Sequence, residues 1–170
     1  IDISYAFQYF NVDYIPYPLR GWYVDVYASK RFNHNLNQWS FGGKYLHTWQ
    51  LFPNSYFTIQ AAGIVKFSAN QPYFNRHLMG YGDLSMRGLE YYVIDGVAAS
   101  VAKYTLKKNL VAFSIPFPFG IKKIPRLPFA IYAKTYADIG YSYSQKEFDT
   151  MLGNKLLYTA GFGLDILSLY

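Results

Sequence analysis

The chain has 170 residues, enough for one domain with its own core. Aromatic residues make up 21% of it and charged residues only 15%, whereas an average soluble domain has about 25% charged residues. No stretch approaches the roughly 20 consecutive apolar residues of a membrane-spanning helix, and the absence of cysteine excludes disulfide scaffolds and cysteine-bound metals. The net charge of +6 does not indicate a nucleic-acid partner, because the basic residues are scattered. The two tight pairs, Lys107 with Lys108 and Lys122 with Lys123, are expected to face solvent or lipid headgroups.

Alternation of apolar and polar residues dominates the chain and predicts β-strands. In the first segment, Ile3, Tyr5 and Phe7 alternate with small or polar residues, and a proline-rich turn follows. In the fourth, Phe57 and Ile59 face opposite to Thr58 and its polar neighbours. The predicted strands are 1–11, 21–32, 38–52, 55–68, 96–115, 128–144 and 154–170.

The alternation stops between residues 69 and 95. A segment of this length without regular structure is usually functional or disordered. It is rich in glycine, tyrosine and asparagine and contains Arg76 and Arg87, so it does not resemble a simple polar linker. Connections at one end of the strands are 12–20, 53–54 and 116–127, and those at the other end are 33–37, 69–95 and 145–153. Outer-membrane barrels have short turns on the periplasmic side and longer loops outside, which is the pattern here except for the long turn at 116–127.

These features predict an all-β fold, a transmembrane antiparallel β-barrel that spans residues 1–170 as part of a larger barrel. The strands exceed the length of about 5–6 residues usual in globular domains and suit the ~9–11 residues that cross a bilayer. About seven strands are predicted, whereas single-chain bacterial barrels have even numbers and lipid does not tolerate an open edge, so we expect further strands or a second copy. No signal peptide precedes Ile1, and we therefore expect a longer protein. Aromatic residues near strand ends are expected at the membrane interfaces: Trp22, Trp39, Trp49, Tyr141 and Tyr143.

The loop segment 85–92 contains the motif Met86, Arg87, Gly88 and Leu89. This motif resembles the Arg-Gly-aromatic signature of the sixth extracellular loop in the BamA/TamA (surface antigen) superfamily, with Leu89 in place of the usual aromatic residue. Residues 92–96 resemble the entry to the next strand in Bacteroidetes members. Further on, residues 136–140 resemble the family's aromatic-x-Asp-x-Gly motif and residues 161–165 the strand that follows it. The resemblance covers about residues 76–170, in matching order and spacing.

The resemblance implies that the long loop folds into the barrel lumen and that Arg87 pairs with Asp138, between Tyr136 and Gly140. The alternation independently predicts that Asp138 points inward, opposite Ile139, because a charge that faces lipid is costly. The alternative is that Asp138 pairs with its strand neighbour Lys134 while Arg87 stays in water. Many family members have a glutamate on the strand after the loop, and here Thr105 is nearest to that place.

The resemblance also implies a non-enzymatic protein of the bacterial outer membrane that assists insertion of barrel proteins or translocation of polypeptides. Its expected partners are outer-membrane lipid and lipopolysaccharide, client polypeptides and accessory subunits, without nucleic acid. No catalytic, cofactor-binding or metal-binding residues are predicted, since His34, His47 and His77 lack ligand spacing. Two alternatives stay open: the membrane barrel of a patatin-like phospholipase whose catalytic domain lies upstream, and a plain pore or adhesin.

Overall fold

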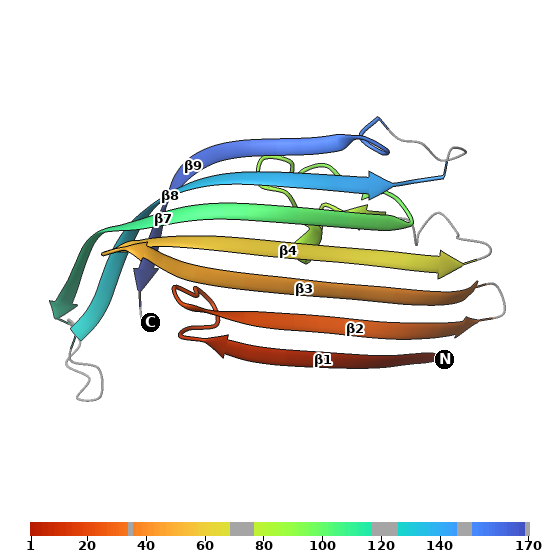
Figure 1. Ribbon diagram of the computed structural model, residues 1–170, viewed down its shortest axis with the longest axis horizontal. Helices are drawn as coiled ribbons and strands as arrows, with labels where there is room; N and C mark the ends of the chain where they lie inside the picture. The colour runs from red at the N-terminus through yellow and green to blue at the C-terminus, as the bar shows by residue number, and fades with distance from the viewer. Residues whose placement is uncertain (34–35, 69–76, 117–125, 146–150, 169–170) are drawn as a thin grey trace.

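The protein folds as one long antiparallel sheet with a loop segment packed on it (Figure 1). The computed structural model describes residues 1–33, 36–68, 77–116, 126–145 and 151–168. Seven strands pair in the order β1-β2-β3-β4-β7-β8-β9. Their bounds, which lie close to the predicted ranges, are β1 Asp2–Val12, β2 Gly21–Asn33, β3 Leu36–Phe52, β4 Ser55–Ser68, β7 Ala98–Pro116, β8 Arg126–Tyr143 and β9 Leu156–Ser168. Among the described residues, no helix has the length and apolar character that a membrane-spanning helix needs.

The two faces of the sheet differ in what they carry. Residues 77–95 cross one face, here called the inner face, behind β4, β7 and β8 in Figure 1, and the opposite side is the outer face. Cross-strand register places Lys103, Asp138 and Thr159 side by side on the inner face. On the outer face of the described strands, the charged residues are Lys30 and Lys108, near opposite ends of the sheet. The outer face instead exposes large apolar side chains such as Tyr5, Trp39, Ile139, Tyr158, Phe162 and Ile166.

The segment between β4 and β7 has more regular structure than the sequence predicted. It contains the short strands β5 (His77–Met79) and β6 (Ile94–Asp95), which pair with each other, and the 3-10 turn η2 (Gly82–Leu84). These elements are too short to produce a readable alternation, which explains why the pattern appears to stop. Residues 69–76, with Arg76, lie outside the described residues.

The connection between β1 and β2 reaches across the inner face to the far side of the sheet. The Tyr17 hydroxyl donates a hydrogen bond of 2.9 Å to the Asp165 carboxylate on β9, and its ring lies 5.4 Å from that of Tyr132 on β8. The Lys107 ammonium lies 3.7 Å from the centre of the Tyr17 ring and donates to the Pro18 carbonyl oxygen. The sheet must therefore be strongly curled, with its inner face concave.

The prediction that Lys107 faces solvent or headgroups is wrong. Its side chain is buried beneath the β1–β2 connection, because residue 107 points inward on β7 while Lys108 points outward. The inner position is favourable because the Tyr17 ring and the Pro18 carbonyl compensate the buried charge. The other pair, Lys122 with Lys123, lies outside the described residues.

Replacement of Tyr17 by phenylalanine tests the contact that closes the curl. The Tyr17→Phe protein keeps its ring against Tyr132 but leaves one Asp165 oxygen without its hydroxyl donor, so we expect about 1–2 kcal/mol lower unfolding free energy. Urea unfolding in detergent micelles measures this. Tyr14→Phe is the matched control, because Tyr14 lies exposed in the same connection and should not alter the unfolding midpoint. Equal midpoints for both variants would contradict the contact.

Candidate functional site

The site is built where the loop segment 77–95 packs on the inner face of β7, β8 and β9. Its apolar residues Leu78, Met79, Met86 and Ile94 form a cluster with three residues of the sheet, namely Ala99, Val101 and Leu157. Gly140 lies beneath this cluster, and a Cβ there would come within 2.5 Å of the Met86 sulfur. The absence of a side chain at Gly140 therefore lets the loop approach the sheet closely.

The Asp138 carboxylate is the electrostatic centre of the site. It is completely buried, with an exposed fraction of 0%, on the middle of β8. Arg87 compensates its charge: the Nε group donates to both carboxylate oxygens at 3.0 and 3.2 Å, Nη2 donates to Oδ1, and the Arg87 backbone N–H donates to Oδ2 at 2.9 Å. Both the side chain and the backbone of one loop residue thus hold the same carboxylate. The predicted pair of Arg87 with Asp138 is present, and the alternative partner, Lys134, binds Asp165 instead.

Two further groups complete the environment of the Arg87 guanidinium. The ring of Tyr136 lies 4.2 Å from the guanidinium carbon, a distance suited to a cation–π interaction. Tyr136 itself occupies the space over Gly161 on β9, where a Cβ would come within 2.6 Å of the Tyr136 hydroxyl. Gly161 therefore gives the tyrosine ring room to lie against the arginine.

Thr105 on β7 takes part in the site, at the place where the motif resemblance led us to look for a glutamate. Its hydroxyl accepts a hydrogen bond of 2.8 Å from Nη1 of Arg87, and the Tyr104 carbonyl accepts one of 3.2 Å from Nη2. The guanidinium thus faces one carboxylate and two neutral oxygens. The negative charge of Asp138 balances the positive charge of Arg87, and the nearby charges of Lys103 and Glu90 also act on this pair.

The glycine of the Arg-Gly motif has a conformational role. Gly88 has a φ of +87°, in the region that side chains disfavour, and a Cβ there would make only ordinary van der Waals contact with Thr159. Its backbone N–H donates a hydrogen bond of 2.9 Å to the Glu90 carboxylate, which lowers the pKa of Glu90. Leu89, at the position that is usually aromatic, packs partly buried against the apolar cluster. The motif therefore forms a tight turn that presents Arg87 to β8.

A second ionic contact ties the loop to the centre of the sheet. The Lys44 ammonium on β3 lies 2.5 Å from the Asp83 carboxylate in η2. Sequence reasoning missed this pair, although the alternation of β3 places Lys44 on the inner face. A lysine on the polar side of a predicted membrane strand was the available signal.

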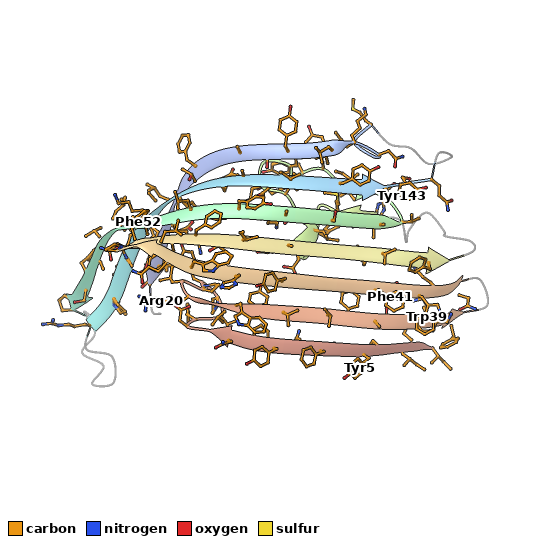
Figure 2. All side chains as sticks on the ribbon, in the orientation of Figure 1. Tyr5, Arg20, Trp39, Phe41, Phe52 and Tyr143 are labelled. Carbon is orange, nitrogen blue, oxygen red and sulfur yellow. The ribbon has the colours of Figure 1, made fainter. Side chains whose placement is uncertain are left out.

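The aromatic residues predicted at strand ends all lie on the outer face. Trp39 and Tyr143 lie at the end of the sheet that carries the long connections (Figure 2). Tyr141 lies two residues further from that end on β8. Trp22 and Trp49 lie toward the opposite end, where Trp22 packs between Tyr9 and Tyr45.

The histidines are dispersed. His47 stacks on Trp49 at 3.9 Å on the outer face, His77 contacts Asp95 at 2.6 Å beside the β5–β6 pair, and His34 lies outside the described residues. In the part of the chain that the structure describes, no group of three His, Cys, Asp or Glu side chains could hold a metal ion. Comparisons with protein-family models, with curated proteins and with solved structures returned no match.

Removal of either charged partner should release the loop. In Arg87→Ala the Asp138 carboxylate stays buried without its counter-charge, and in Asp138→Ala the guanidinium loses its acid, so each should cost about 3–5 kcal/mol. Gel migration of unheated and progressively heated samples reports this as a lower conversion temperature. Arg126→Ala is the matched control, since Arg126 is exposed at the start of β8. Unchanged conversion in both site variants would count against this role of the pair.

Proposed function

We propose that the sheet is the wall of an outer-membrane β-barrel of the BamA/TamA type, which assists insertion of barrel proteins or translocation of polypeptides. The first support is the character of the outer face. Phe162 on β9 is 88% exposed, and its neighbours Leu164 and Ile166 are each more than half exposed. Soluble proteins rarely expose continuous apolar surfaces of this kind, and lipid is the solvent that suits them.

The spacing of the outer aromatic residues supports the same orientation in a bilayer. On β3, Trp39 and Trp49 both face outward, one toward each end of the strand. They are about ten residues apart, which at a rise of ~3.3 Å per residue and a tilt of ~35–45° gives about 23–27 Å along the membrane normal. This agrees with the apolar band of about 25 Å in outer-membrane barrels, which is bounded by aromatic girdles.

The observation that carries the functional part of the proposal is the attachment of the Arg-Gly loop to Asp138. The resemblance to BamA/TamA barrels is strongest in these segments. The loop turn with Arg87, strand β8 with Asp138 and strand β9 with Gly161 lie together on one concave face. A plain pore needs an open passage, whereas here the inner face of β7 to β9 is covered by the loop at one end and by the β1–β2 connection at the other. This arrangement favours an assembly barrel over a pore.

The two edges of the sheet give the proposal a mechanism. No described strand pairs with the free side of β1 or of β9. Ile1 and Phe32 exchange both backbone hydrogen bonds, so the backbone groups of Ser4, Ala6 and Gln8 point away from β2, toward that free edge. Such an edge suits the pairing of the further strands expected for the barrel, and a client strand could pair by β-augmentation at the seam where the completed barrel closes.

The assembly function is tested by depletion of the protein from the cells that produce it. We expect the amounts of folded, heat-modifiable outer-membrane proteins to fall, and we expect wild-type protein to restore them while Arg87→Ala restores them poorly. Normal assembly of other barrels after depletion would contradict the assembly function. It would not contradict the proposal that the sheet is the wall of a barrel. Phospholipid hydrolysis by the purified full-length protein would instead favour the patatin-like alternative.

The membrane orientation of the wall has its own test. Ala61 faces outward in the middle of β4 and Ala6 faces inward on β1, so Ala61→Lys and Ala6→Lys add the same charge to opposite faces. We expect Ala61→Lys to make folding into phosphatidylcholine vesicles less favourable by about 2–4 kcal/mol, because the ammonium enters the bilayer centre. We expect Ala6→Lys to change the folding free energy by much less. A larger loss for Ala6→Lys would reverse the assignment of the faces.

A further inference from the structure

A pocket of about 550 Å³ opens at the end of the outer face that carries the long connections. Its lining includes Lys30 on β2, Asn37 on β3, Val65 and Phe67 on β4, and Tyr143 and Gln145 at the end of β8. The lining thus combines two lysines, Lys30 and Lys66, and two amides with apolar and aromatic side chains. Charged groups are unfavourable on a surface that faces only lipid chains, so this mixture indicates an amphiphilic ligand.

Two aromatic rings hold Lys30 in position. Its ammonium lies 4.7 Å from the ring centre of Trp39 and 5.4 Å from that of Phe32. Within the described residues, no carboxylate forms an ion pair with it, whereas Arg31 beside it, which points inward, is bound by Asp2. The charge of Lys30 is therefore available to an anion that approaches from the outer face.

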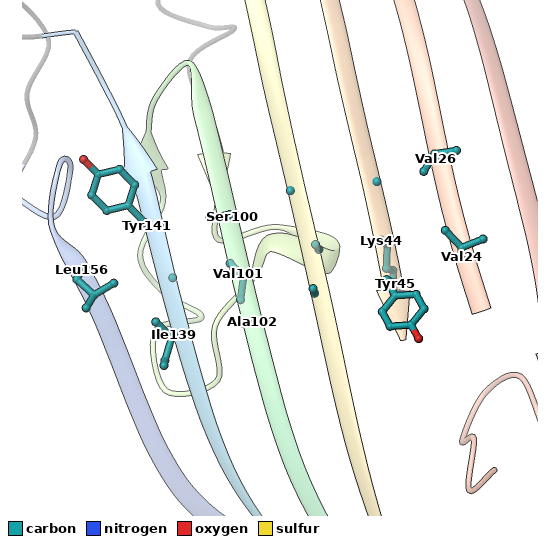
Figure 3. A pocket seen from close by; sticks show the side chains of 15 residues that line it. Val24, Val26, Lys44, Tyr45, Ser100, Val101, Ala102, Ile139, Tyr141 and Leu156 are labelled. Atoms are coloured by element: carbon teal, nitrogen blue, oxygen red, sulfur yellow. The ribbon is translucent and has the colours of Figure 1, made fainter. Parts of the chain in front are cut away.

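The pocket adjoins a groove that follows the strands toward the middle of the outer face. Small residues form its floor, Ala61 and Gly63 on β4 and Ser100 and Ala102 on β7, and the groove encloses about 480 Å³. Figure 3 shows the walls: Tyr45 stands on one side, and Ile139 and Tyr141 stand on the other. Val65 and Tyr143 of the pocket are each two residues along the strand from Gly63 and Tyr141 of the groove, so the pocket and the groove adjoin.

We propose that the pocket at Lys30 and the groove behind it bind one phosphorylated lipid, with the phosphate on the Lys30 ammonium and an acyl chain along the floor of small residues. This inference rests on the proposed membrane wall, because only that orientation brings Lys30 to the height of lipid headgroups. Charge complementarity selects an anionic headgroup over a zwitterionic one. The amides of Asn37 and Gln145 can donate to the remaining phosphate oxygens.

The test measures lipid retained by the folded protein. The full-length protein in micelles is titrated with dioleoyl phosphatidic acid or with dioleoyl phosphatidylcholine, and bound lipid is counted by native mass spectrometry. We expect Lys30→Gln to weaken phosphatidic acid binding about tenfold, as loss of one hydrogen bond to a charged group implies, and Lys30→Arg to retain it. Lys155→Gln is the matched control, since Lys155 lies at the same end of the sheet and its ammonium is bound by the Met151 carbonyl.

Several outcomes would overturn the site. Equal binding to the wild type and to Lys30→Gln, or equal binding of phosphatidylcholine, would show that Lys30 does not select the headgroup. Displacement of phosphatidic acid by an equal concentration of inorganic phosphate would identify a site for the free anion and not for a lipid. Failure of the wild type to enter phosphatidylcholine vesicles would contradict both the proposed barrel wall and this site. If the wild type enters vesicles but shows no preference for phosphatidic acid, only this site is contradicted.

Discussion

The buried charge of Asp138 governs how the loop is placed. A carboxylate without solvent contact in the middle of a strand destabilises the fold unless a cation and several donors reach it, and Arg87 supplies both from one residue. Two glycines make this arrangement possible because they lack side chains. Gly140 lets the loop come close to the sheet, and Gly161 leaves room for Tyr136, which lies against Arg87. The contact of the loop with β8 and β9 is thus organised around one compensated charge.

Much of the sheet could be predicted from the sequence because its two faces carry residues of different character. Period-two alternation placed Asp138 on the inner face and Ile139 on the outer face, and the register confirms both. The loop motif brought Arg87 to Asp138, as expected from its resemblance. These predictions succeeded because each depends on the local spacing of residues along the sequence.

The contacts that alternation could not reveal connect residues far apart in the sequence. The burial of Lys107 depends on the β1–β2 connection, and no local pattern places Tyr17 above it. Thr105 joins the Arg87 site through a hydroxyl that could equally have faced water. Short paired elements such as β5 and β6 are also invisible to periodicity, since they form only because the loop folds back on itself.

The contact of Tyr17 with Asp165 joins residues 148 positions apart and thereby links the first connection of the sheet to its last strand. A sheet fixed in this way sets its own radius of curvature, so the gap between its two edges has a defined width. Since β1 and β9 run in the same direction, only an odd number of additional strands can fill that gap with antiparallel pairing throughout. In the proposed barrel, this internal contact would help to fix the curvature of the seven described strands, while the number of strands and their stagger would set the circumference.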